Sequence, residues 1–360
     1  MGEIERIIEG ISDLDAKSMM EAQIRQNELT KPPGSLGVLE QISIRLAGMQ
    51  GTPMPEIGKK VVIVMAADHG ITEEGVSAFP SDVTAQMVYN FTDGGAAVNV
   101  LARLAEAEVI AVDIGVKHEI KTQGVIQKKI RPGTANMARG AAMTHTQAKD
   151  AVLVGAEVAG RAIEKGASLV ATGDMGIGNT SASSAIISSL GDIELEAVVG
   201  RGTGIDDEGL KRKLAAIKLA LEHNRPDKND PLDVLHKVGG LEIAGLAGVI
   251  LECARRRTPV IIDGFISSAA ALVASKMAPK AINYMIASHM SVEKGHSRAL
   301  SEIGLSPMLN MNMRLGEGTG AVLTMTVVEA AAKLLSEMAT FEQAGVSRRK
   351  REEASPAQSG

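Results

Sequence analysis

The sequence predicts an α/β protein built on a doubly wound, mostly parallel sheet with helices on both faces. Short apolar runs recur along the middle of the chain, each run ends in a small polar cluster, and a helix-like stretch follows each cluster. Continuous apolar runs of this length are typical of parallel strands that are buried on both faces. The runs expected to form strands are VVIVMAA (61–67), VIAV (109–112), LVAT (169–172), PVII (259–262) and YMIA (284–287).

Helices are expected at both ends of the chain. Apolar residues recur at helical spacing in residues 4–11 and 36–46, and the intervening KPPGSLG must break the helix. The run VLTMTVVEAAAKLLSEM, residues 322–338, predicts a long C-terminal helix. We therefore expect a small helical domain from the N- and C-terminal segments, and a charged, then Ser/Pro/Gln-rich, disordered tail. The predicted division is 1–58 with 318–346 for the small domain, 59–317 for the large α/β domain, and 347–360 for the tail.

Composition excludes several classes of protein. The 360 residues are 45% hydrophobic, enough for a sizeable core, but only 2% aromatic, so that core must be aliphatic. A formal net charge of -5 argues against a general nucleic-acid binder, and the single Cys253 excludes a disulfide framework. No apolar run approaches the roughly 20 residues that span a bilayer, and the acidic N-terminus is unlike a secretory signal. We expect a cytoplasmic protein with no membrane partner.

Polar clusters follow the predicted strands, at the edge where ligands bind in parallel sheets. We therefore expect these side chains to gather into one site. Oxygen and imidazole groups at strand ends also suit a metal-dependent phosphohydrolase, although no HExxH or close His pair gives ligand-like spacing. No metal is expected, and activity that survives chelation would dismiss this rival. The cluster residues are Asp68, His69, Asp113, Asp174, Asp263 and His289.

Two glycine-rich segments suggest an anion site. In GDMGIGNT, residues 173–180, glycines end a strand and Asn179 and Thr180 open a helix, whose free N–H groups attract a phosphate. The segment lacks the Walker Lys and the dinucleotide pattern, and a simple tight turn is the alternative. In GRGTGIDDEGLKRK, residues 200–213, Lys213 is placed to neutralise a phosphate, although a lone helical Lys is usually solvated.

A carboxylate and an apolar slot complete the candidate chemistry. Glu317 stands between two glycines ahead of an apolar helix, an arrangement that lets its carboxylate project into a cavity. The alternative interpretation is that Glu317 is an acidic residue in the first turn of a helix, where its charge interacts favourably with the helix dipole. Phe79, Pro80 and Met87 suit a slot for a flat heteroaromatic ring, unless they simply form local core.

The ordered motifs resemble a known family. They are KPPGSLG, ADHG, GVSAFPSDVTAQM, GDMGIGNT, GRGTG, DGFISSAAAL, SHMSVEKGH and LNMNMRLGEGTGA. Over residues 1–345 the chain is similar to the nicotinate-nucleotide:dimethylbenzimidazole phosphoribosyltransferases. The resemblance implies transfer of ribose phosphate from nicotinate mononucleotide to a benzimidazole, with inversion and without a cofactor, in cobalamin nucleotide-loop assembly. It also implies a homodimer in which the small domain of one subunit closes over the other's site.

The resemblance also assigns residues. Glu317 is implied as the catalytic general base, and Asp174 is the second candidate catalytic residue. The implied nucleotide and phosphate site comprises Gly173, Gly176, Ile177, Gly178, Asn179, Thr180, Gly202, Thr203, Gly204, Lys213, Gly264 and Ser291. The implied base-binding wall comprises Phe79, Pro80, Gln86, Met87, Met175 and Leu315.

Two questions stay open at the level of sequence. The acceptor base is dimethylbenzimidazole, another benzimidazole, adenine or a phenol, since an apolar slot discriminates a methyl group by only about 1–3 kcal/mol. A nucleotide-binding sensor without turnover is the non-enzymatic rival. Release of nicotinate on addition of a benzimidazole would separate the enzyme from the sensor.

Overall fold

A six-stranded parallel sheet forms the centre of the molecule, in a computed structural model that describes residues 2–202 and 204–347. The strand order is β3-β2-β1-β4-β5-β6, and every pairing is parallel. The chain thus builds outward from β1 to one side and then from β4 to the other, so the direction of winding switches between β1 and β4. The strands are β1 (Lys59–Ala67), β2 (Ala107–Gly115), β3 (Val125–Gln127), β4 (Ala167–Met175), β5 (Val260–Ile262) and β6 (Met285–Ala287).

All five predicted apolar runs overlap a strand, and the doubly wound parallel sheet is confirmed. The sequence missed β3, a three-residue edge strand that pairs with β2. Such a strand is too short to show a periodic pattern. Residues 348–360, which hold nearly all of the predicted tail, lie outside the described residues.

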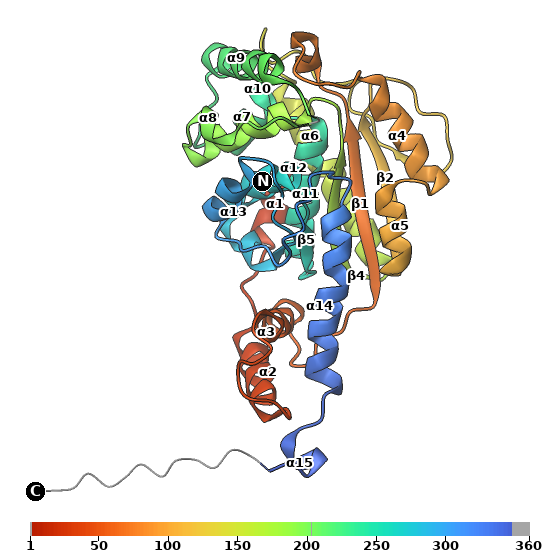
Figure 1. Cartoon of the computed structure of the whole chain (residues 1–360), viewed down its shortest axis with the longest axis vertical. Coiled ribbons are helices and arrows are strands. Elements are labelled where there is room, and N and C mark those ends of the chain that lie inside the picture. Colours follow the sequence, from red (N-terminus) through yellow and green to blue (C-terminus); the bar gives the residue numbers. More distant parts are fainter. Residues whose placement is uncertain (1, 203, 348–360) are drawn as a thin grey trace, which may run out of the picture.

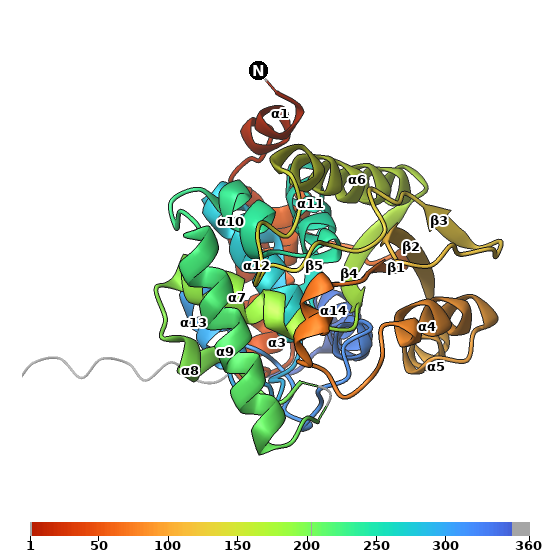
Figure 2. The ribbon, with the colours of Figure 1, turned by 90° about the horizontal axis from the view of Figure 1, so that it is seen from above.

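Helices cover both faces of the sheet (Figure 2). One face carries α6 (His145–Glu164) and α11 (Leu241–Arg255), and the other carries α4 (Asp82–Asp93), α5 (Ala97–Leu104) and α14 (Thr319–Glu337). The remaining large-domain helices are η1 (Gly70–Glu74), α7 (Asn179–Gly191), α8 (Leu195–Val198), α9 (Asp207–Asn224), α10 (Pro231–Val238), α12 (Phe265–Met277), η2 (Pro279–Tyr284) and α13 (His296–Ile303).

Helices α6 and α11 cross at backbone contact. A Cβ atom added to Gly155 would overlap the carbonyl oxygen of Gly245, and one added to Gly248 would overlap that of Val152. Glycine is therefore required at this crossing, because any side chain would push the helices apart and open the aliphatic core.

A smaller helical unit lies at the end of the molecule opposite the carboxyl ends of the strands (Figure 1). Here α2 (Ala16–Glu28) and α3 (Val38–Gln50) pack on the C-terminal part of α14, and α15 (Phe341–Ala344) follows. The Arg25 guanidinium donates hydrogen bonds to the carbonyl oxygens of Leu335, at 2.6 Å, and Ser336, at 3.0 Å. These bonds occupy carbonyl groups that a helix end leaves free.

The predicted division of the chain needs two corrections. Helix α1 (Glu3–Glu9), assigned by the prediction to the small unit, packs against α6 and α11 on the sheet. Similarly, α14 belongs to both units, because it also contacts β4, β5 and α5. Helical spacing shows that a helix has an apolar face, but it does not show which neighbour covers that face.

Helix α14 is also long and apolar enough, by length and composition, to cross a membrane. It instead behaves as a core helix: Val322, Met325 and Val328 are fully buried within the main hydrophobic core.

Candidate active site

A cavity of about 640 Å³ opens at the carboxyl edge of the sheet, beside β4 and β5. It lies next to the point between β1 and β4 where the reversal of winding predicts a ligand site. Its walls come from α4, the start of α7, the start of α12 and the segment that precedes α14. Thirteen predicted site residues line it: Phe79, Met87, Asp174, Met175, Gly176, Ile177, Asn179, Thr180, Gly202, Gly264, Ser291, Leu315 and Glu317.

His289, expected at the site only as a strand-end polar residue, also lines the cavity. Six further lining residues were not assigned to the site from the sequence: Val83, Phe265, Ile266, Glu293, Arg314 and Gly316. Val83 was within reach of sequence reasoning, because it stands one helical turn before Met87 on α4. Phe265 and Ile266 carried no such signal. They begin a buried helix and read as ordinary core residues.

Some predicted residues stand outside the cavity wall. Pro80 and Gln86 are exposed and are not among the lining residues, and their place in the base-binding wall stays a prediction. Gly178 packs over Thr72 and His69, whereas a Cβ added to Gly204 would meet no atom of the described residues within 4 Å. Thr203 lies outside the described residues.

Lys213 lies behind the cavity wall rather than on it. The side chain is fully buried, and its Nζ donates hydrogen bonds to Thr180 Oγ1 at 2.8 Å and to the Gly200 carbonyl oxygen at 3.1 Å. Burial lowers the pKa of Lys213 to about 8, an effect that the negative charge of Glu293 opposes. Lys213 thus places a positive charge directly behind Thr180, at the start of α7, where the sequence predicts a phosphate.

The polar strand-end residues divide between two cavities, contrary to the prediction of a single site. Asp174 and His289 line the main cavity, whereas Asp68 and His69 line a second one of about 480 Å³. His69 Nε2 pairs with Glu242 Oε1 at 2.7 Å. Asp113 faces neither cavity and pairs with Lys129.

Glu317 occupies an unusual backbone position. Its φ of 63° is left-handed, and the flanking glycines Gly316 and Gly318 have φ of 81° and 94°. A non-glycine residue in this region costs on the order of 1–3 kcal/mol, so the surroundings must hold it there. Only 5% of Glu317 is exposed, and its Oε2 accepts a hydrogen bond from the Val98 N–H at 3.3 Å, near the N-terminus of α5.

The electrostatics of the cavity favour a basic carboxylate. Burial raises the pKa of Glu317, and the hydrogen bond from Val98 opposes that shift only in part. A carboxylate with a raised pKa binds a proton more readily than an ordinary glutamate, yet the Val98 donor still stabilises the ionised form. Glu317 is therefore suited to accept a proton from a ligand.

Asp174, in contrast to Glu317, is suited to hold a proton. Burial raises the pKa of Asp174 well above its usual value, and the negative charges of Asp263, Glu242 and Glu317 raise it further. Its Oδ2 accepts a hydrogen bond from Asn179 Nδ2 at 3.0 Å, whereas its Oδ1 has no partner among the described residues. A protonated carboxyl group donates a hydrogen bond, so two carboxyl groups with different environments line one cavity.

An apolar slot faces these carboxyl groups. Phe79 and Leu315 are 52% and 59% exposed, although large hydrophobic residues usually avoid water. Both stand at the cavity, together with Val83, Met87 and Met175. A flat heteroaromatic ring would cover these side chains and remove their apolar surface from water.

The rival metal site finds no geometric support within residues 2–202 and 204–347. No group of three or more His, Cys, Asp or Glu side chains in this part of the chain is arranged to hold a metal ion. His289, which lines the cavity, instead bonds Ser288 Oγ through Nδ1 at 3.0 Å, and burial lowers its pKa.

A family model described as a phosphoribosyltransferase matches residues 11–346. The chain belongs to the phosphoribosyltransferase family. The glycine loop, buried carboxyl groups and apolar slot are thus the candidate active site of an enzyme of this family.

Relatives and solved structures agree with this assignment. A protein of Halalkalibacterium halodurans named nicotinate-nucleotide–dimethylbenzimidazole phosphoribosyltransferase is 52% identical over 347 residues, covering 96% of this chain and 97% of the relative. A protein of Chloroflexus aurantiacus with the same name is 54% identical over 345 residues, with 96% and 98% coverage. The crystal structure of the phosphoribosyltransferase of that name from Thermus thermophilus matches with a TM-score of 0.89 at 48% identity, covering 93% of this chain and all of that one.

Proposed function

We propose that this phosphoribosyltransferase converts nicotinate mononucleotide and 5,6-dimethylbenzimidazole into α-ribazole 5'-phosphate and nicotinate, in cobalamin nucleotide-loop assembly. The observation that carries the proposal is the buried carboxylate of Glu317 on the wall of a cavity that also holds a phosphate-type glycine loop and an apolar slot. The names of the relatives from Halalkalibacterium and Chloroflexus support the choice of substrates.

The chemistry of the leaving group explains why the proposed reaction needs one general base and no general acid. The nicotinate ring of the donor is a pyridinium, so breaking its bond to the ribose sends an electron pair to a positively charged nitrogen. Departure neutralises that charge, and no general acid is required. The catalytic demand therefore falls on the incoming base.

The benzimidazole is a weak nucleophile until its N–H proton is lost. In the proposed step, one ring nitrogen bonds to the anomeric carbon while Glu317 accepts the proton from the other nitrogen. Attack opposite the departing nicotinate inverts the anomeric carbon and gives the α-nucleotide. The protonated form of Asp174 is suited to donate a hydrogen bond to the substrates without competing for that proton.

The phosphate anchors the donor at a distance from the reacting atoms. The N-terminus of α7, at Asn179 and Thr180, and the buried charge of Lys213 behind it supply the attraction. Binding energy at the phosphate then aligns the ribose with both rings, and alignment of this kind supplies much of the rate enhancement in a displacement reaction.

Two further parts of the proposal concern the assembled protein. We propose a homodimer, as the resemblance to the family implies, in which the small helical unit of one subunit closes over the site of the other. A cytoplasmic location is proposed on the acidic, single-cysteine composition.

The reaction itself is tested by product analysis. Purified protein with nicotinate mononucleotide and dimethylbenzimidazole should release one nicotinate for each nucleotide formed, and proton NMR should show the α-anomer. Parallel reactions with benzimidazole, adenine and a phenol identify the preferred acceptor. Formation of the β-anomer would contradict direct displacement, and no release of nicotinate with any acceptor would contradict the proposed function.

Replacement of the proposed base tests its role. Glu317→Ala should lower kcat by roughly 10²–10⁴, the contribution usual for a general base. The Kd of nicotinate mononucleotide should change little, since Glu317 faces the incoming ring. Steady-state kinetics and calorimetric titration measure the two quantities. Near-normal turnover would remove Glu317 from the reaction.

The pH dependence follows from the sign of the Glu317 shift. The reaction needs the ionised form, and burial raises the pKa of Glu317, so kcat/KM should fall as the pH drops through a value above the ordinary 4.5. The acid limb should stay in place with acceptors of different basicity, because it belongs to the enzyme. A limb that moves with the acceptor's own pKa would assign the titration to the substrate instead.

The buried charge of Lys213 behind the proposed phosphate site distinguishes the two substrates. Lys213→Met should raise the KM of nicotinate mononucleotide by about 10–100-fold, as expected for loss of about 1.5–3 kcal/mol from a charged hydrogen bond. The KM of the benzimidazole should change much less. Lys218→Met, an exposed residue of the same helix, is the matched control. Equal weakening of both substrates would rule out a selective phosphate role.

A further inference from the structure

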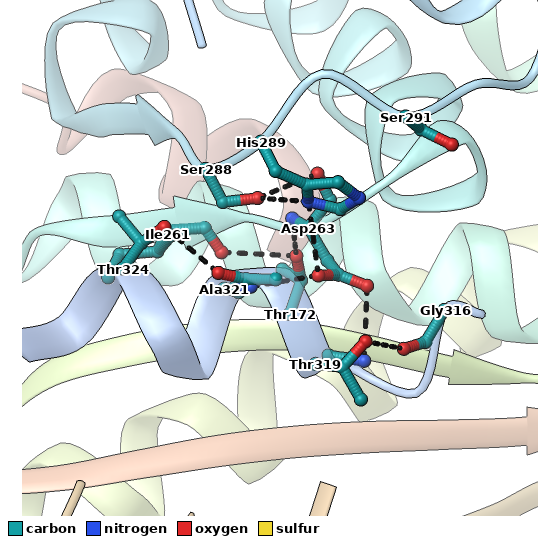
Figure 3. Close-up of polar contacts among 12 residues, drawn as sticks. Thr172, Ile261, Asp263, Ser288, His289, Ser291, Gly316, Thr319, Ala321 and Thr324 are labelled. Carbon is teal, nitrogen blue, oxygen red and sulfur yellow. Dashed lines mark hydrogen bonds and ion pairs between the residues drawn. The ribbon is translucent and has the colours of Figure 1, made fainter. Parts of the chain in front are cut away.

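Asp263 is a fully buried carboxylate that the proposed reaction does not use. It follows β5 directly, and its side chain points to the start of α14 (Figure 3). Oδ2 accepts a hydrogen bond from the Gly318 N–H at 3.1 Å, and Oδ1 accepts one from the Ala321 N–H at 2.8 Å. The residue at the N-cap position of α14 is Gly318, which has no side chain to cap the helix, so Asp263 supplies the cap from 55 residues away.

The capped residues are the ones that determine the position of Glu317. Gly318 follows Glu317 directly, and both have left-handed backbone angles. On the other side, a Cβ on Gly173 would lie 2.5 Å from the Glu317 carbonyl oxygen, so the end of β4 packs directly on this turn. The turn is thus held between β4 and the Asp263 carboxylate, which supplies the support that a strained backbone requires.

Asp263 is itself fixed by the neighbouring strands. Its N–H donates to Thr172 Oγ1 at 3.2 Å, and the Thr172 hydroxyl donates in turn to the Ile261 carbonyl oxygen at 3.2 Å. Ser288 Oγ donates to the Asp263 carbonyl oxygen at 3.0 Å (Figure 3). The backbone of Asp263 is therefore connected to β4 and to the end of β6 as well as to β5, which fixes the point from which its carboxylate extends.

Burying the Asp263 carboxylate costs free energy, which suggests that this residue does more than stabilise the fold. Burial raises the pKa of Asp263 to about 7, against the opposing effect of the N–H groups of Ala321 and Gly318. A buried charge is an expensive way to cap a helix, when a serine or threonine beside the helix would serve. Its two oxygens, however, fix two points of the turn at once, which a single hydroxyl does not.

We propose that Asp263 is a positioning residue of the transfer reaction, because it holds the left-handed turn that directs the Glu317 carboxylate at the acceptor N–H. This inference rests on the proposed role of Glu317 as the base. Asp263 does not line the cavity, so it acts through Glu317 and not on the substrates.

A double-mutant cycle on the full-length protein tests the inference. Asp263→Asn keeps the size of the side chain but turns an NH₂ group toward one of the backbone N–H donors. It should lower kcat by about 10–100-fold, the effect of misplacing a catalytic group by about 1 Å, with the KM of nicotinate mononucleotide changed less than about threefold. In a Glu317→Ala background, Asp263→Asn should lower the residual turnover less than about twofold, because the carboxylate that Asp263 positions is already absent.

Two further variants separate positioning from folding. Asp113→Asn is the matched control, since Asp113 is also fully buried at a strand end and accepts the Val116 N–H at 2.9 Å, but lies outside both cavities. Its kcat, corrected for the folded fraction, should remain near that of the wild type. Thr172→Val removes the hydroxyl that fixes Asp263 and is the milder test if Asp263→Asn does not fold. Thr172→Val should lower kcat less than Asp263→Asn does, and it should have this effect only in a protein that retains Glu317.

The outcomes are distinct. An equal fall in kcat with and without Glu317 would overturn the positioning role, as would an Asp263→Asn variant with normal kcat. A Glu317→Ala variant with near-normal turnover would instead overturn the proposed function itself. A fall that disappears in the Glu317→Ala background would support the inference.

Discussion

The buried carboxyl groups at the carboxyl edge of β4 and β5 impose the constraint on which the candidate site depends. Asp174, Asp263 and Glu317 are each at most 5% exposed, and a charge removed from water must find hydrogen-bond donors or bind a proton. The three groups meet this demand differently. Asp263 accepts hydrogen bonds from two backbone N–H groups, and Glu317 accepts one from the Val98 N–H. The raised pKa of Asp174 favours its protonated form. One edge of the sheet thus holds acidic groups with different affinities for a proton.

The fold makes this arrangement possible through two features. The winding of the sheet changes direction between β1 and β4, so the connections that follow these two strands lead away from each other and leave a crevice at the carboxyl edge of the sheet. The long helix α14 then enters the edge with its N-terminus, whose free N–H groups require an acceptor. Asp263 meets that requirement, and the turn before the helix places Glu317 at the cavity.

The apolar side of the cavity has a different origin. In a chain that is only 2% aromatic, Phe79 and Phe265 both stand at this cavity, beside Met175, Leu315 and other aliphatic residues. Methionine and leucine side chains fit flat rings through surface contact and impose little directional preference. In the proposed reaction, this wall would hold a flat ring by surface contact, and the ring nitrogen that reaches Glu317 would distinguish one acceptor from another.

The amino-acid sequence by itself determined the strand runs, the parallel sheet and the glycine loop at 173–180, and it singled out Glu317 as a candidate. These features are local, because apolar runs and glycine patterns express backbone and burial preferences of neighbouring residues. Tertiary structure alone decided that α1 packs on the sheet and that Asp68 and His69 face a second cavity. It also decided the pairing of Asp263 with a turn 55 residues away, since contacts between distant segments leave no periodic trace in the chain.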